Sequence, residues 1–463
     1  MCMRNSGSTA SSYQPQISFQ MSQETLEAKS NITVDVVSVS ENDASESSLP
    51  PVDHGFHAYA YLASAWLVEL LVWSYPFSYG VFLDYYKTHI FPTAPTSILA
   101  LVGSMSTGII YLSSWLVLPV ISRFPALKKP LMALGVVFCV AGLVGAAFAT
   151  EPWQLVLTQG VIYAVGGSFL YFPTMTWLFE WFSTRKGLAN GIIFSGTGVG
   201  GVAVPFIVEG LLHRYGCRTT LLSMAIAFAV LIIPAFPYMK PRLPVSKSTT
   251  RSLEFNSFMR SPVFWILFAA NLIQGLPTYI PVLYMPTFAA DLGLSDNTGS
   301  LSLALVNGAS VFGLVLLGWL SDRFDLRIAM LVSSLGSSLA VLLLWGFSSG
   351  EPLFLVFSFV YGVIGPSWSA LWPRFIASIV GDDPHMSSIV LTVFIGGRGV
   401  GNVASGPVAS AILRNWPLTG KAAFAYGLKG YGPLVLFTGL TLLLSAAGVG
   451  YKRFQKRGNS HSV

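Results

Sequence analysis

The sequence predicts an all-α membrane protein whose twelve transmembrane helices form two pseudo-symmetric halves of six helices each. Three observations predict this class. Charged residues make up 10% of the 463 residues and the mean hydropathy is +0.63, whereas a soluble domain carries about 25% charged residues. Apolar runs of membrane-spanning length recur along the chain, and a glycine-rich pattern of the first half returns in the second. A chain so poor in charge cannot cover a water-facing surface and needs lipid as its solvent.

Twelve runs reach the length of a membrane span, which is about 20 mainly apolar residues. They cover residues 58–82, 97–121, 130–149, 153–175, 187–211, 219–238, 262–287, 298–320, 328–347, 352–373, 387–412 and 432–450. Proline and glycine inside these runs do not exclude a span, because neighbouring helices satisfy the backbone groups that they leave free.

The spans divide the chain into five expected regions. Residues 1–52 are rich in Ser, Thr, Asn, Gln and acidic residues and lack an apolar run, which predicts a disordered cytoplasmic tail. We expect an N-terminal six-helix half at 53–238 and a C-terminal six-helix half at 262–450. A cytoplasmic linker at 239–261 would join them, and a second cytoplasmic tail would follow at 451–463.

The distribution of Lys and Arg predicts the orientation of these regions. If both termini lie on one side, 19 of the 26 basic residues fall on that side, 6 fall on the other side and Arg398 lies within a span. Because cytoplasmic loops carry the excess of Lys and Arg, both termini are expected in the cytoplasm. The plasma membrane is the expected location.

Two pairs of stretches indicate that the halves arose by duplication. SGTGVGGVA at 195–203 aligns with GGRGVGNVA at 396–404, an offset of 201 residues. SRFP at 122–125 aligns with DRFD at 322–325, an offset of 200 residues. Two parallel halves related by an axis along the membrane normal are a transporter architecture, and the solute site then lies between them near the midplane.

The stretch GWLSDRF at 318–324 resembles the Gly-x-x-x-Asp-Arg loop motif of the major facilitator superfamily. More narrowly, the chain resembles the monocarboxylate porter family, particularly its fungal branch. The resembling stretches are WSYPFSYGVFLDYY (73–86), LTQGVIYAVGG (157–167), EWFSTRKGLANGI (180–192), PRLP (241–244) and RGVGNVASGP (398–407). The resemblance implies secondary transport by alternating access. It also implies that Asp322 and Arg323 gate the transporter by holding one conformation, whereas Arg323 alone would be ordinary for an inside loop.

The chain lacks the charges on which the animal porters of this family rely. Their Lys of helix one and their Asp-x-x-x-Arg pair of helix eight correspond to positions near Phe77, Ser310 and Leu314. This loss, with the export role attributed to the fungal branch, favours efflux of a secondary metabolite or organic anion. Proton-coupled uptake of a monocarboxylate or vitamin-like solute is the alternative. A non-transporting nutrient sensor on the same fold is a second alternative, which the short C-terminal tail disfavours.

Two charges of opposite sign fall near the middle of predicted spans, Glu69 in the first and Arg398 in the eleventh. A charge at this depth costs at least about 2.5–3.5 kcal/mol, so it usually faces a cavity or a partner. Glu69 is a candidate site for a coupling proton or a solute contact, and Arg398 is a candidate site for a carboxylate or phenolate, held by bidentate hydrogen bonds. The alternative is that each charge is paired within its own half. A direct pair between Glu69 and Arg398 is a third arrangement.

Other polar and aromatic residues of the helices that line the cavity in this fold are candidate solute contacts. They are Tyr75, Gln159, Tyr163, Asn271, Gln274, Tyr279, Asn307, Trp368 and Trp372. Aromatic rings suit flat or apolar solutes, but each residue would also suit ordinary packing or hydrogen bonding between helices. The glycine pairs Gly196/Gly200 and Gly397/Gly401 are expected to permit close helix packing, which also lets two halves rock against each other.

Enzymatic activity is not expected. The six histidines fall at or outside the ends of the predicted spans, so no cluster within the spans matches a metal site. The sequence holds no Gly-x-Ser-x-Gly elbow, and no strand–loop–helix context for a phosphate site. We therefore expect no metal, no cofactor and no nucleic-acid partner. The expected partners are a small organic solute, the lipid bilayer and, as a candidate coupling ion, protons.

Overall fold

The computed structural model describes three stretches of the chain: residues 49–244, 258–415 and 426–454. The chain from Pro50 onward forms one compact unit, and the fold described below lies within it. Most of the expected tail at 1–52, of the expected linker at 239–261 and of the expected tail at 451–463 lies outside the described residues.

Every regular element that the structure describes is a helix, with π and 3-10 turns labelled η. The elements of the first half are α2 (Phe56–Tyr85), η1 (Tyr86–Ile90), α3 (Thr96–Leu112), α4 (Ser114–Arg123), η2 (Pro125–Leu127), α5 (Lys128–Ala147), α6 (Pro152–Leu155), η3 (Val156–Ile162), α7 (Tyr163–Thr176), α8 (Leu178–Trp181), α9 (Lys186–Ala235) and η4 (Phe236–Tyr238).

The second half begins at Pro262 and shows the same alternation of long helices and short breaks. Its elements are α11 (Pro262–Thr278), α12 (Ile280–Asp291), α13 (Asp296–Arg323), α14 (Leu326–Leu339), η5 (Ala340–Trp345), α15 (Glu351–Ile364), η6 (Pro366–Leu371), α16 (Trp372–Val380), α17 (Pro384–Asn415), η7 (Leu428–Gly430), α18 (Gly432–Ser445) and η8 (Ala446–Gly450).

Among the described residues, these elements join into eleven continuous segments that are long and apolar enough to cross a membrane. The segment Lys186–Tyr238 has 53 residues, which at about 1.5 Å per residue is more than twice the hydrocarbon thickness of about 30 Å. Gly216 breaks this segment with a φ of 75°, a conformation that glycine adopts without a steric penalty. The segment therefore crosses twice, which gives twelve crossings and confirms the predicted fold class.

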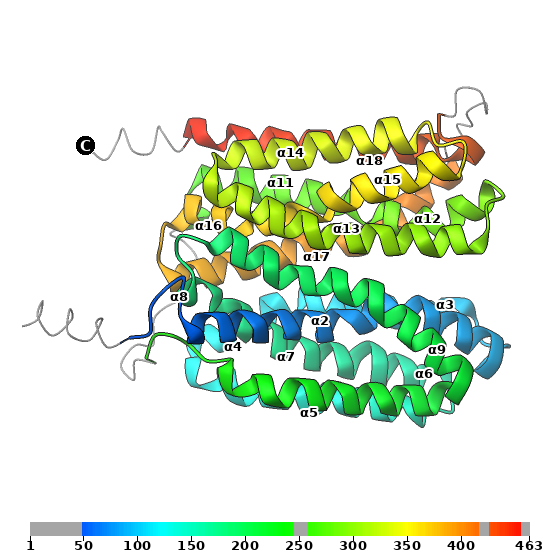
Figure 1. The fold of residues 1–463 in the computed structure, drawn as a ribbon, viewed down its shortest axis with the longest axis horizontal. Coiled ribbons are helices and arrows are strands. Elements are labelled where there is room, and N and C mark those ends of the chain that lie inside the picture. The colour runs from blue at the N-terminus through cyan, green and yellow to red at the C-terminus, as the bar shows by residue number, and fades with distance from the viewer. Residues whose placement is uncertain (1–48, 245–257, 416–425, 455–463) are drawn as a thin grey trace, which may run out of the picture. The chain divides into compact units, whose positions relative to one another are not determined.

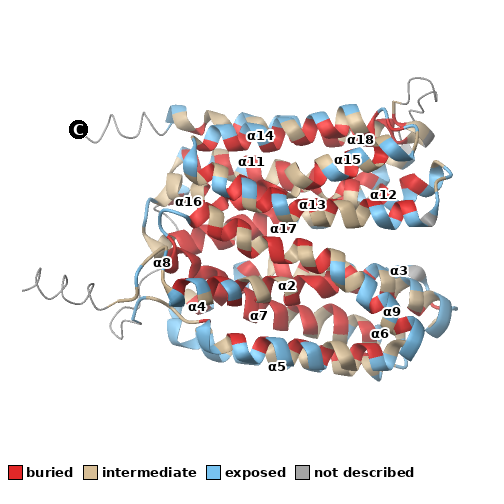
Figure 2. Cartoon of the chain, viewed as in Figure 1, coloured by how far each residue is buried: buried red, intermediate tan, exposed pale blue. Residues whose placement is uncertain are grey.

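Within this unit, the helices of the two halves form two neighbouring bundles (Figure 1). Buried residues gather along α2, α7, α13 and α17, whereas α5 and α14 show many exposed residues on their outer faces (Figure 2). Large apolar side chains such as Leu134 and Val137 of α5 and Leu339 of α14 are exposed there. In a membrane protein such residues face lipid, so the exposed apolar surface agrees with the predicted spans.

The repeated glycines pack each half onto its own first helix. A Cβ atom on Gly196 would lie 2.6 Å from the carbonyl oxygen of Trp66, and one on Gly200 would lie 3.0 Å from Cβ of Ser74. In the second half, a Cβ atom on Gly401 would lie 2.8 Å from a backbone nitrogen of α11. The expected close packing is therefore present, and it brings α9 against α2 and α17 against α11.

The glycines between these pairs face the opposite half. A Cβ atom on Gly198 of α9 would lie 2.7 Å from the hydroxyl of Ser310 on α13. A Cβ atom on Gly399 of α17 would clash with Cβ of Tyr111 on α3. Each repeat thus uses alternating glycines to contact its own half and the other half, and the two halves meet along α9 with α13 and α17 with α3.

Candidate functional site

A cavity lies between the two halves where α2, α9, α13 and α17 approach one another. It encloses about 680 Å³ of unfilled space, including the solvent space at its mouth. Its lining residues are Glu69, Trp73, Phe77, Tyr111, Phe194, Thr197, Gly198, Thr278, Tyr279, Val282, Val306, Asn307, Ser310, Leu314, Pro366, Ser369, Trp372 and Arg398. The lining contains one acid, one base and many aromatic or apolar side chains.

Glu69, on α2, lies in the part of the cavity wall that the first half forms. Its side chain is buried, and Oε1 accepts a hydrogen bond of 2.6 Å from the hydroxyl of Thr197. Among the described residues, Oε2 has no hydrogen-bond partner. A carboxyl group in this position can take up a proton or accept a hydrogen bond from a solute.

Arg398, on α17, lies in the part of the cavity wall that the second half forms. Its Nη1 donates a hydrogen bond of 2.5 Å to Oε1 of Gln274. Its guanidinium carbon lies 5.8 Å from the ring centroid of Tyr279 and 5.9 Å from that of Trp372. These are cation–π distances, so two ring faces stabilise the charge. No carboxylate of the described residues lies within ion-pair distance of Arg398.

Two tyrosines join the halves at the cavity. The hydroxyl oxygens of Tyr111 and Tyr279 lie 3.1 Å apart. Among the described residues, Glu69 and Arg398 do not form the direct ion pair that was one expected arrangement. The acid and the base therefore share the cavity without neutralising each other by contact.

Five of the predicted contact residues line this cavity: Glu69, Arg398, Tyr279, Asn307 and Trp372. Their positions agree with a solute-contacting role. Asn307 also donates a hydrogen bond of 3.4 Å to the carbonyl oxygen of Gly201, across the halves.

Two predicted residues lie behind the cavity wall and hold its side chains. Oδ1 of Asn271 accepts a hydrogen bond of 2.8 Å from the indole nitrogen of Trp372. Gln274 holds Arg398 and also donates a hydrogen bond of 3.1 Å to the carbonyl oxygen of Gly365. In this structure, both residues hold lining side chains and are not lining residues themselves.

Four predicted residues lie within the helix packing and are not among the lining residues: Tyr75, Gln159, Tyr163 and Trp368. Gln159 donates a hydrogen bond of 2.8 Å to the hydroxyl of Tyr86. The hydroxyl of Tyr163 donates to the carbonyl oxygen of Leu71 at 2.9 Å. These contacts match the alternative of ordinary packing and hydrogen bonding between helices.

Sequence reasoning missed Thr197 and Tyr111. A signal for Thr197 was present, because it occupies the position in the first repeat that Arg398 occupies in the second. Each of these two side chains bonds to the first helix of its own half, Thr197 to Glu69 and Arg398 to Gln274. Tyr111 carries no comparable sequence signal, since a tyrosine in an apolar helix is usually packing.

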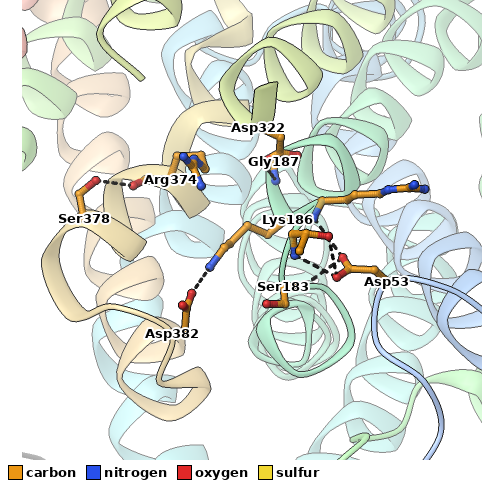
Figure 3. A network of polar contacts seen from close by, with 10 residues as sticks. Asp53, Ser183, Lys186, Gly187, Asp322, Arg374, Ser378 and Asp382 are labelled. Atoms are coloured by element: carbon orange, nitrogen blue, oxygen red, sulfur yellow. Dashed lines mark hydrogen bonds and ion pairs between the residues drawn. The ribbon is translucent and has the colours of Figure 1, made fainter. Parts of the chain in front are cut away.

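A second group of polar contacts joins the halves at one end of the unit. We call this end, where Asp53, Lys186, Asp322 and Asp382 lie, the tail end (Figure 3). Oδ1 of Asp322 accepts a hydrogen bond of 3.0 Å from the backbone N–H of Gly187, and Oδ2 accepts one of 2.7 Å from that of Leu188. These amides open α9, and a carboxylate is stabilised at a helix N-terminus by unpaired N–H groups and the helix dipole.

The loop before α9 is held from the other side by Asp53. Its carboxylate accepts backbone hydrogen bonds from Ser183, Thr184 and Arg185 at 2.9–3.1 Å (Figure 3). Partial burial alone would raise the pKa of Asp53, but these hydrogen bonds outweigh it and hold the pKa below its ordinary value. Arg323, the other residue expected to act as a gate, is exposed.

Comparison with known proteins adds the family. The family described as Major Facilitator Superfamily matches residues 67–406. The "MFS transporter asaE" of Aspergillus flavus is 26% identical over 367 residues, covering 79% of this chain and 82% of that protein. The "Fujikurins efflux protein" of Gibberella fujikuroi is 28% identical, covering 63% of this chain and 68% of that protein. The "Agnestins efflux protein AgnL12" of Paecilomyces divaricatus is 25% identical, covering 92% and 94%.

Solved structures agree on the fold. The E. coli fucose:proton symporter FucP has a TM-score of 0.62 at 14% identity, covering 86% of this chain and 99% of that chain. The proton:xylose symporter XylE has a TM-score of 0.65 at 13% identity, covering 84% of this chain and 94% of that chain. At this level of identity the likeness concerns the arrangement of helices.

Proposed function

The chain belongs to the Major Facilitator Superfamily, and we propose that this transporter exports a small organic solute, a secondary metabolite or organic anion, from the cell. The observation that carries the proposal is the cavity between the halves, in which Glu69 and Arg398 are buried without pairing with each other. Two related proteins bear names as efflux proteins of fungal metabolites, which supports export as the direction.

We further propose that alternating access opens and closes the tail end. The excess of Lys and Arg on that side supports a cytoplasmic location for it and for both termini. The structure then represents the state in which the cavity is closed to the cytoplasm, since Asp322 and Lys186 tie the two halves together there. Opening to the cytoplasm requires these contacts to break, which makes Asp322 part of the gate.

Several finer assignments belong to the same proposal. The stretches at 73–86 and 398–407 support membership in the monocarboxylate porter-like branch. The halves at 53–238 and 262–450 and the linker between them follow from the repeat. The plasma membrane suits an exporter, and transport in place of catalysis suits the family. Protons are proposed as the coupling ion because, among the described residues, Oε2 of Glu69 in the cavity wall has no hydrogen-bond partner, which leaves this oxygen free.

The alternative function is proton-coupled uptake of a monocarboxylate or vitamin-like solute. The same free oxygen of Glu69 favours it, because a buried carboxyl in a transporter is a common proton site. Export and uptake predict opposite distributions of the solute between cell and medium, so they can be separated without knowing the solute in advance.

The decisive experiment is deletion of the gene followed by metabolite profiling of cells and medium. Export predicts that one product accumulates inside the cells and that the wild-type gene restores its release. Failure of the deletion strain to use an external solute would instead support uptake. Unchanged profiles and growth under conditions in which the gene is expressed would contradict both.

Variants at matched surface expression then connect the function to the cavity. Glu69→Gln and Arg398→Ala are expected to reduce solute flux at least about tenfold, because each removes a buried ionisable group that faces the cavity. Arg414→Ala is the control, since Arg414 is an exposed arginine at the end of the same helix as Arg398. Normal flux in both cavity variants would remove Glu69 and Arg398 from the mechanism.

A further inference from the structure

Arg398 is an incompletely satisfied cation in the cavity wall. Its side chain is 2% exposed, and the hydrogen bond to Gln274 is the one that the structure describes for it. A guanidinium carries five N–H donors in a planar fork, so several donors remain for a ligand. A buried cation costs free energy unless a group of opposite charge and matching geometry pairs with it and accepts its hydrogen bonds. The acidic group of a bound solute can be this partner.

The surroundings of Arg398 favour a flat solute. Tyr279 and Trp372 both lie within 6 Å of its guanidinium carbon, measured from their ring centroids. Val282 and Pro366 add apolar surface to the same wall. If the acidic group of the solute binds Arg398, an aromatic ring attached to that group can stack against Tyr279 and Trp372.

On the wall formed by the first half, Glu69 favours a solute with a second polar group. Oε1 of Glu69 is occupied by the hydroxyl of Thr197, while Oε2 is buried and has no partner among the described residues. A carboxyl oxygen without a partner can accept a hydrogen bond from a donor on the solute. The part of the solute that faces Glu69 therefore suits a hydroxyl donor.

We infer that the cavity takes a flat aromatic carboxylate or enolate that also carries a hydroxyl group, with the acidic group on Arg398 and the hydroxyl on Glu69. The inference rests on the proposed function and names its solute class. An organic cation bound at Glu69 would be repelled by the unpaired positive charge of Arg398 in the same cavity. A neutral solute would leave that charge uncompensated.

The test measures binding to the full chain in lipid nanodiscs by isothermal titration calorimetry. The probes are 2-naphthoate, 2-naphthamide, 6-hydroxy-2-naphthoate and decalin-2-carboxylate, which vary the charge, the hydroxyl and the aromatic ring separately. We expect 2-naphthoate to bind at least about tenfold tighter than 2-naphthamide and than decalin-2-carboxylate, since charge-assisted and stacking contacts each contribute. The hydroxyl is expected to tighten binding further, by about threefold or more.

Arg398→Gln should bring 2-naphthoate and 2-naphthamide to within about twofold of each other, whereas the control Arg414→Gln should keep the wild-type preference. Trp372→Leu is a second variant that keeps the charge, and it should reduce the preference for 2-naphthoate over decalin-2-carboxylate. Glu69→Leu should abolish the gain from the hydroxyl, because it removes the acceptor.

Equal binding of 2-naphthoate and 2-naphthamide by the wild-type protein would overturn the inference. Retention of the carboxylate preference in folded Arg398→Gln would also overturn it, as would an unchanged ring preference in Trp372→Leu. These outcomes concern binding and are separate from the deletion experiment. Export of a product without any anion preference would contradict the solute class alone, and anion binding without changed metabolite profiles would contradict the proposed function alone.

Discussion

Lys186 and Asp382 form an ion pair between the two halves at the tail end. Nζ of Lys186 lies 2.7 Å from Oδ1 of Asp382 (Figure 3). The two side chains differ in environment, since that of Lys186 is 7% exposed and that of Asp382 is 82% exposed. The nearly buried Lys186 is therefore paired with a carboxylate that is open to water.

Replacing Lys186 by Met should open the tail end only slightly. An ion pair with one exposed partner contributes about 0–1 kcal/mol because water screens it, and Met keeps the apolar stem that Lys186 packs. The measurement is hydrogen exchange of the backbone amides at 183–190 in nanodiscs, with Asp382→Asn as the matched change on the other partner. Exchange that rises more than about tenfold in either variant would show that the pair is a main determinant of closure.

Replacing Asp322 by Asn should weaken closure more strongly. The variant keeps the size of the side chain but removes the charge that two backbone amides of α9 contact. We expect the closed state to lose about 1–2 kcal/mol, seen as faster exchange at Gly187 and Leu188 and as reduced solute flux. Arg323→Gln is the matched control, because Arg323 neighbours Asp322 but is exposed. Equal effects of the two variants would contradict a specific role for Asp322.

Replacing Gly198 by Ala should impair transport without preventing folding. The new Cβ atom would lie 2.7 Å from the hydroxyl of Ser310 and 2.8 Å from a backbone oxygen of Asn307, so the two halves would have to separate locally. Gly210→Ala on the same helix is the control, because nothing lies within 4 Å of its added methyl. That control should be neutral or stabilise the helix by about 0.5–1 kcal/mol. Normal flux in Gly198→Ala would show that the halves do not need this close approach.

Acidification within the physiological range should leave the contacts of Asp53 and Asp382 intact. The hydrogen bond and positive charge of Lys186 hold the pKa of Asp382 below its ordinary value of 3.8, and backbone hydrogen bonds lower that of Asp53. A lowered carboxyl pKa gives stability that is present above the ordinary pKa and is lost as pH falls through the lowered value. The amides of residues 183–185 donate to Asp53, so their hydrogen exchange, corrected for intrinsic rates, should be equal at pH 5.5 and pH 7.5. A marked increase at pH 5.5 would contradict this assignment.

The fold could be predicted from the sequence because its determinants are local. The length of an apolar run is set by bilayer thickness, so the twelve spans could be predicted without knowledge of their packing. The two runs flanking Gly216 were separated correctly even though the structure joins them into one 53-residue helical segment. The mid-span positions of Glu69 and Arg398 were visible for the same reason.

The facing of polar residues could not be predicted in the same way. Asn271 and Gln274 are polar like the residues that line the cavity, yet they lie behind the wall and hold Trp372 and Arg398. In a membrane helix, residues that bond to a neighbouring helix and residues that face a cavity share the same polar composition. The hydrogen-bond partners of Asp322 are backbone amides. Every residue other than proline carries such an amide, so no sequence pattern predicts which residues bond to Asp322.

The contact between the halves at Gly198 and Gly399 has an evolutionary consequence. Neither position leaves space for even a methyl group, so inherited changes there would disturb the motion itself. The cavity wall, in contrast, holds side chains of very different volume, such as Phe77 and Thr278. A substitution at a wall position such as Phe77 therefore changes the cavity and leaves both close approaches as they are.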